Sequence, residues 1–198
     1  MPQGTSVDEN QRVLLFSADE ISTIRAISRE KNVFRMLTDS LCPEIFGHEI
    51  VKAGLLLGLF RGREDSHGAT GSFSIRSNSH ILLVGDPGLG KSQMLTAVST
   101  TAPRSVFVGA NTSTAAGLTA TLHQEGGPGE YALEAGALVL ADQGCCCIDE
   151  FDKISEYKVL LDVMEQQVVN VAKAGVVCSL PARTSIMAAA NPVGGHYK

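Results

Sequence analysis

The chain has 198 residues, of which 44% are apolar and 19% charged, and its formal net charge is −5. This length and apolar content suffice to bury a core, which excludes a wholly disordered chain. The longest apolar run, at 53–60, is eight residues. A membrane-spanning helix needs about 20, so we expect no membrane segment, and the N-terminal residues lack the apolar stretch of a secretory signal.

Cysteine usage restricts the function classes further. The five cysteines are Cys42, Cys145, Cys146, Cys147 and Cys178, and none of them forms a Cys-x-x-Cys pair. This spacing predicts neither a zinc site nor a disulfide framework. We expect the three consecutive cysteines to act as small apolar residues in a buried strand, and reducing, intracellular surroundings fit best.

The N-terminal part of the chain predicts helices. Ser17 and Glu20 form a capping box ahead of apolar positions that continue at helical spacing to Leu37. Pro43 ends this pattern. A second helix is expected over 49–60, apolar on most faces and therefore buried. The Gly- and Ser-rich residues 61–79 predict a loop or linker.

The rest of the chain alternates strands and helices. Strands are expected at 80–84, 105–109, 145–148 and 184–190, and helices at 91–102, 133–141 and 157–167. Residues 117–131 predict a hairpin or irregular insertion, and 168–171 with 175–180 predict a hairpin. Such alternation is typical of an α/β fold with a parallel sheet flanked by helices.

The strongest motif is a phosphate-binding loop between a predicted strand and a predicted helix. Its residues are Gly85, Asp86, Pro87, Gly88, Leu89, Gly90, Lys91 and Ser92. The glycines allow backbone N–H groups to surround phosphate oxygens, and the helix N-terminus favours the same negative charge. Lys91 is expected to reach the β- and γ-phosphates, and the Ser92 hydroxyl is expected to bind Mg²⁺. The alternative is an ordinary Gly-rich turn with a surface lysine.

Polar residues end two further predicted strands. Asp149 and Glu150 follow the cysteine strand, where Asp149 would hold Mg²⁺ and Glu150 would activate the attacking water. Asn191 ends the last strand and could orient that water, with a plain turn before Pro192 as the alternative. We interpret Asp152 and Lys153 as a solvated helix start, where an aspartate suits the helix dipole.

Together with other stretches, these motifs resemble the ATPase domain of the minichromosome maintenance (MCM) helicases, which are AAA+ motors. The further matching stretches lie at 45–49, 133–142, 148–153, 164–167, 173–175 and 188–192. The resemblance implies a P-loop AAA+ core with a parallel sheet, a helix-2 insertion near 117–131 and a pre-sensor-1 β-hairpin. We accordingly divide the chain into a lead-in segment with a helix at 1–40 and a partial core at 41–198.

The resemblance also implies roles and partners. It makes 85–92 the Walker A loop, Asp149 and Glu150 the Walker B acids, and Asn191 sensor 1. It places Lys173 at a hairpin tip that contacts DNA in the central channel, without sequence specificity. The implied cofactors are ATP and Mg²⁺. The implied partners are single-stranded or forked DNA and other family subunits in a hexameric ring, in the nucleus.

Gly90 indicates a branch of the family, because the six replicative branches usually carry alanine there. The eighth and ninth branches resemble this chain in carrying glycine, and the stretches 88–91 and 178–185 are most similar to the eighth. This similarity implies a role in homologous-recombination repair of double-strand breaks, with the ninth branch as partner.

The chain departs from the family pattern at both ends. The oligonucleotide-binding region, the arginine finger, the sensor-2 arginine and the lid have no counterpart in these residues, so we expect a fragment or truncated form. An arginine finger contributes about 10³–10⁵ in rate, so we expect the chain alone to hydrolyse ATP poorly. Two alternatives remain, which are another helix-2-insertion ATPase such as a chelatase subunit and a truncated, non-catalytic interaction module.

Overall fold

The structure is a computed structural model that describes residues 16–62, 77–109, 114–125, 127, 131–154, 157–173 and 176–192. Most of the predicted linker at 61–79 lies outside these residues. The chain separates into two compact units, Met1–Met36 and Leu37–Lys198. The division at residue 40 made from the sequence remains a prediction.

The first helix begins at the predicted capping box. Helix α1 spans Ala18–Ser28, and the Glu20 backbone N–H donates to Ser17 Oγ at 3.2 Å. In return, the Ser17 N–H donates to Glu20 Oε2 at 2.7 Å. The apolar pattern that continues to Leu37 belongs to two helices and not to one. Helix α1 ends at Ser28, and α2 spans Val33–Ser40. The four intervening residues, 29–32, are all charged or polar and offer no apolar face that packing could hold in a helix.

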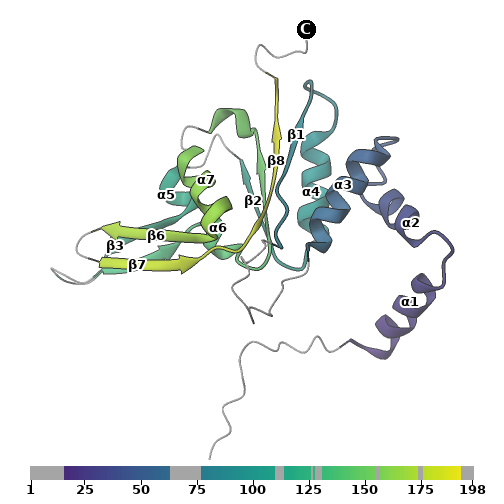
Figure 1. Cartoon of the computed structure of the whole chain (residues 1–198), viewed down its shortest axis with the longest axis horizontal. Helices are drawn as coiled ribbons and strands as arrows, with labels where there is room; N and C mark the ends of the chain where they lie inside the picture. The colour runs from purple at the N-terminus through teal and green to yellow at the C-terminus, as the bar shows by residue number, and fades with distance from the viewer. Residues whose placement is uncertain are drawn as a thin grey trace, which may run out of the picture. The chain divides into compact units, whose positions relative to one another are not determined.

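Four parallel strands form the central sheet of the second unit (Figure 1). These are β1 (Ile81–Val84), β2 (Ser105–Gly109), β5 (Cys145–Asp149) and β8 (Ser185–Ala190), in the order β1-β8-β5-β2. The parallel sheet predicted from the sequence is confirmed. Because the strands run in one direction, their carboxyl ends share one edge of the sheet, which is where ligands bind in open α/β sheets.

Helices pack on both faces of this sheet. Two apolar clusters result, one with α3 (Glu49–Phe60) and α4 (Lys91–Thr101), the other with α6 (Ala137–Leu140) and α7 (Tyr157–Gln166). Cys145 and Cys147 join the first cluster and Cys146 the second, because neighbouring strand residues point to opposite faces. All three are buried free thiols, as expected, and burial raises the pKa of Cys146 to about 12.

Two antiparallel hairpins accompany the sheet. After the short helix α5 (Ala115–Leu118), β3 (Ala120–Gln124) pairs with β4 (Tyr131–Ala135), and later β6 (Val168–Lys173) pairs with β7 (Val176–Pro181). The hairpin predicted at 168–180 is confirmed. Figure 1 shows the β6–β7 hairpin extending away from the four-strand sheet.

The helix predicted over 133–141 is wrong in its first half. Leu133 lies in β4 opposite Leu122, and helix α6 begins only after Gly136. The Gly136 N–H donates to the Thr119 carbonyl at 2.7 Å, and a Cβ at Gly136 would lie 2.6 Å from Thr119 N. Cross-strand pairing and this close backbone approach override the helical preference of the Ala- and Leu-rich sequence.

Helix α3 has the predicted bounds, but it is only partly buried. Leu55 and Leu56 are buried, whereas Ile50 is 89% exposed and Leu57 58% exposed. The sequence interpretation missed this because a helix that is apolar on most faces can still present one face to solvent. Among the described residues, no helix combines the length and the apolar character needed to cross a membrane.

Candidate nucleotide-binding site

A cavity of about 370 Å³ lies at the carboxyl-terminal edge of the sheet. It is lined by the predicted loop and by the residues that end two strands. These lining residues are Pro87, Gly88, Gly90, Lys91, Ser92, Gln93, Asp149, Glu150, Ala189, Ala190 and Asn191. Three motifs separated in the chain therefore meet at one site.

The loop owes its shape to two glycines in the left-handed region. Gly88 has φ +83° and Gly90 has φ +79°, values that non-glycine residues rarely adopt. A Cβ at Gly90 would also collide with the Ile45 side chain. Helix α4 begins at the next residue, Lys91, so its N-terminus faces the cavity where phosphate would be favoured.

Lys91 is held at the centre of the site. Its Nζ donates to the Gly85 carbonyl at 2.6 Å, to the Asp86 carbonyl at 2.7 Å and to Asn191 Oδ1 at 3.1 Å. The first two contacts bend the side chain back over its own loop. The third joins the loop to the end of β8. The ammonium group is thus placed inside a ring of oxygen acceptors that a phosphate could replace.

The two acids predicted at the end of β5 also line the cavity. The Glu150 N–H donates to Asp149 Oδ1 at 2.9 Å, and Glu150 adopts the left-handed conformation, with φ 56° and ψ 41°. Glu150 Oε1 accepts a hydrogen bond from Lys153 Nζ at 2.8 Å, and this bond raises the pKa of Lys153. Strained backbone of this kind persists where the surroundings hold it, often at functional sites.

Asp152 does not line the cavity, but it contacts a residue that does, and the sequence interpretation missed this contact. The short 3₁₀ helix η2 (Phe151–Lys153) brings Asp152 Oδ1 to 2.9 Å from the Asn191 backbone N, which donates to it. Lys153 likewise contacts Glu150, so neither residue is merely part of a solvated helix start. The available signal was their position directly after the strand that carries the two acids.

The oxygen atoms of the site suit a magnesium ion. Ser92 presents a hydroxyl and Asp149 a carboxylate to the same cavity. Mg²⁺ prefers oxygen ligands, binds through one or two carboxylates and otherwise uses phosphates and water. Among the described residues, the cavity included, no cluster of three or more His, Cys, Asp or Glu side chains could hold a metal ion without other ligands.

Lys173 is the last residue of β6 and is not among the described residues that line the cavity. Its side chain is outside the described part of the structure. Its predicted contact with DNA therefore stays a prediction.

A parallel α/β sheet with this loop, acids and amide at one edge defines a P-loop nucleotide-binding domain. Comparison with known sequences identifies the family of P-loop domains to which the chain belongs. Residues 20–198 match the MCM P-loop domain, and the chain belongs to the MCM family, as the motifs indicated.

Individual relatives are similar over nearly the whole chain. Over 183 residues, or 92% of this chain, it is 59% identical to "DNA helicase MCM8" of Gallus gallus and 58% identical to that of Homo sapiens. It is 55% identical over 167 residues to "Probable DNA helicase MCM8" of Oryza sativa subsp. indica, covering 84% of this chain. The predicted similarity to the eighth branch is confirmed. The chain spans about a fifth of these relatives' length, 22%, 22% and 21% respectively.

Proposed function

We propose that this chain is the nucleotide-binding part of an ATP-driven DNA helicase motor. The observation that carries the proposal is the contact between Lys91 and Asn191, at 3.1 Å, in a cavity also lined by Asp149 and Glu150. A loop lysine, two acids and a strand-end amide are the groups that position and hydrolyse a nucleoside triphosphate.

Each group has a defined part in this proposal. Lys91 exchanges its carbonyl acceptors for the β- and γ-phosphate oxygens of ATP. Ser92 and Asp149 would hold Mg²⁺, which would neutralise charge on those oxygens. Glu150 accepts a proton from the attacking water, after its carboxylate leaves Lys153. Asn191 orients that water through its side-chain amide.

The relatives' names and the hairpin support the wider part of the proposal. The relatives are named DNA helicases, and Lys173 lies at the end of the first hairpin strand. We propose that the hairpin contacts single-stranded or forked DNA through phosphates, without sequence specificity. From the family resemblance alone, we further propose that the chain belongs to a hexameric ring of family subunits, with a ninth-branch partner, in homologous-recombination repair in the nucleus.

The test is ATP binding and hydrolysis by Lys91→Ala and Glu150→Gln variants. We expect Lys91→Ala to weaken ATP binding by about 100-fold, since it removes the cation that faces the phosphates. We expect Glu150→Gln to bind ATP normally and, when hydrolysis is measured together with a longer family subunit, to lose about 10²–10⁴-fold in rate, the usual contribution of a general base.

Matched controls come from helix α7. Lys158→Ala and Glu165→Gln make the same chemical changes at exposed positions away from the cavity, and both should behave as wild type. Unchanged binding in Lys91→Ala would overturn the site assignment. Wild-type binding without hydrolysis, alone and with a longer family subunit, would favour the non-catalytic interaction module.

A further inference from the structure

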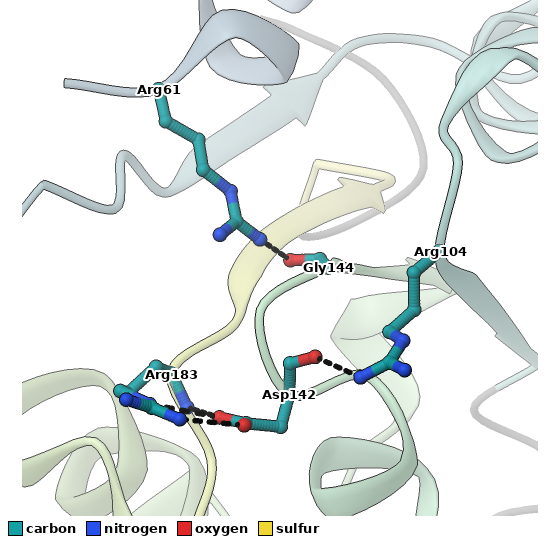
Figure 2. Close-up of polar contacts among 5 residues, drawn as sticks. All are labelled: Arg61, Arg104, Asp142, Gly144 and Arg183. Atoms are coloured by element: carbon teal, nitrogen blue, oxygen red, sulfur yellow. Dashed lines mark hydrogen bonds and ion pairs between the residues drawn. The ribbon is translucent and has the colours of Figure 1, made fainter. Parts of the chain in front are cut away.

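Beyond the cavity, a polar cluster lies at the opposite edge of the sheet, where the strands begin (Figure 2). Asp142, in the segment between α6 and β5, is its centre. Arg183 Nε donates to Asp142 Oδ1 at 3.2 Å and Arg183 Nη2 donates to Oδ2 at 3.0 Å. Arg104 Nη1 donates to the Asp142 carbonyl at 3.0 Å, and Arg61 donates to the neighbouring Gly144 carbonyl.

This cluster holds the base of the β6–β7 hairpin. The Ala182 N–H donates to the Gln167 carbonyl at 2.8 Å, which closes the hairpin beyond its last strand pair. The next residue, Arg183, also donates its backbone N–H to Asp142 Oδ1 at 2.8 Å, and its carbonyl accepts from Gln143 N at 2.9 Å. One carboxylate therefore fixes both the backbone and the side chain of the residue that leaves the hairpin.

Strand β8 connects this point directly to the nucleotide cavity. It begins two residues after Arg183 and ends next to Asn191, and all 6 of its residues are buried. It lies between β1 and β5 in the sheet. Because such an interior is close-packed, a displacement at one end of β8 is transmitted to the other rather than absorbed.

The electrostatics of the pair suit a fixed anchor. The Asp142 side chain is 17% exposed and the Arg183 side chain 42% exposed. Burial alone would raise the pKa of Asp142, but the hydrogen bonds and positive charge of Arg183 outweigh it and hold the pKa below its ordinary value. The carboxylate is therefore charged at neutral pH, and its two-point contact with the guanidinium fixes direction as well as distance.

The rest of the hairpin is held by apolar packing of one strand and by contacts within the hairpin. Val169 and Val171 of β6 are buried in the apolar cluster that also contains residues of α6 and α7, whereas Val177 of β7 is 83% exposed. On its outer face, Ser179 Oγ donates to Asn170 Oδ1 at 2.8 Å, which is a contact within the hairpin. The base at Arg183 is thus where a polar clamp joins the hairpin to the sheet.

We propose that Asp142 is a positioning residue that couples the hairpin to the nucleotide cavity through Arg183 and β8. The inference rests on the proposed function, in which ATP binds in the cavity that Asn191 lines and DNA binds at the hairpin. Binding of either ligand then alters the affinity for the other, and the Asp142–Arg183 pair carries that coupling. By linkage, the effect is the same in both directions.

The test uses the purified 198-residue chain, a fluorescent ATP analogue and an unlabelled single-stranded oligonucleotide. Affinity for the analogue is measured with and without saturating oligonucleotide, and the ratio is the coupling factor. We expect a factor of about 5 or more in the wild-type chain. Asp142→Asn, which keeps the side-chain size and removes the charge, should bring the factor close to 1.

Two comparisons separate coupling from a loss of structure. Asp162→Asn, an exposed carboxylate on α7, should retain the wild-type factor. Arg183→Lys, which keeps the charge, should retain part of the coupling, whereas Arg183→Gln should lose it. The affinity for the analogue alone should stay within about two-fold of wild type in each variant, because none of these residues lines the cavity.

The outcomes are distinct from those that test the proposed function. A coupling factor of 1 in the wild-type chain, or a wild-type factor in both Asp142→Asn and Arg183→Gln, overturns this inference. If the coupling result is negative but Lys91→Ala abolishes binding of the analogue in the same experiment, the coupling inference fails and the assignment of the nucleotide site is retained. If Lys91→Ala binds the analogue as wild type does, the proposed function itself fails.

Discussion

Gly144 provides a quantitative test of how the sheet is assembled. A Cβ there would lie 2.8 Å from Arg104 Cγ and 3.0 Å from the Arg104 carbonyl carbon, and would also collide with its carbonyl oxygen. That oxygen accepts the Cys145 N–H at 3.0 Å, where β5 begins beside β2. Gly144→Ala therefore requires the backbone at residue 144 and the backbone at Arg104 to move apart.

The expected cost follows from these contacts. Overpacking a close-packed interior costs about 1–3 kcal/mol, and weakening the Cys145 hydrogen bond costs about 1 kcal/mol. The reduced entropy of the unfolded chain returns about 0.4–1 kcal/mol for a Gly-to-Ala change. We expect Gly144→Ala to lower the free energy of unfolding by about 1–3.5 kcal/mol, and the Tm by about 2–14 °C.

Two glycines of α3 provide graded controls. Gly54 has no atom within 4 Å of a Cβ, so Gly54→Ala should stabilise the protein by about 0.5–1 kcal/mol. A Cβ at Gly58 would meet the ends of the Ile81 and Met187 side chains, at 2.6 and 2.8 Å, which can shift. Its substitution should be destabilising by about 1 kcal/mol. Urea unfolding measures all three, and equal effects of Gly54→Ala and Gly144→Ala would refute the reasoning.

Three further predictions concern the carboxylates Asp142 and Asp152 and the buried cysteines of β5. Since the folded pKa of Asp142 is lowered, its contribution to stability should be complete above about pH 4 and lost as the pH falls through the lower folded value. Urea unfolding of wild type and Asp142→Asn should therefore converge in acid, and a difference that grows there would contradict the ion pair. Asp152→Ala removes the acceptor of the Asn191 N–H and should weaken binding of an ATP analogue by about 2–5-fold. Asp152→Asn keeps an acceptor oxygen and should bind the analogue as wild type does. Equal affinities in the two variants would show that this hydrogen bond does not contribute to binding. Cys146 and Cys147 are fully buried, and the pKa of Cys146 is raised to about 12. Thiol reagents at pH 8 should therefore modify the two cysteines at least about 100-fold more slowly in the folded protein than in denaturant. Rapid labelling of the folded protein at these positions, located by mass spectrometry, would contradict their burial.

Much of the local structure was predictable, because its causes lie within a few residues. The capping box at Ser17 starts α1, and the loop from Gly85 leads into a helix at Lys91. The predictions failed where distant parts of the chain intervene. Leu133 lies in a strand because Leu122 pairs with it, and Ile50 is exposed although its helix is apolar on most faces.

The candidate site shows the same division. The sequence predicted Lys91, Asp149, Glu150 and Asn191 from motifs, and the structure brings all four to one cavity. The contacts of Asp152 and Lys153 were not predicted. Their neighbours in the chain suggest only a helix start, and the Asn191 backbone that Asp152 contacts is 39 residues away.

By itself, the sequence determined the class of the domain, because a phosphate-binding loop is a local arrangement of glycines, a lysine and a helix start. It also determined the family, through motifs in a particular order. Only the tertiary structure decided which groups meet. Lys91 contacts Asn191 across 100 residues of chain, and Arg183 contacts Asp142 across 41. The physical reason is the strand order β1-β8-β5-β2, which places the last described strand between the first and the cysteine strand, and no local preference specifies that order.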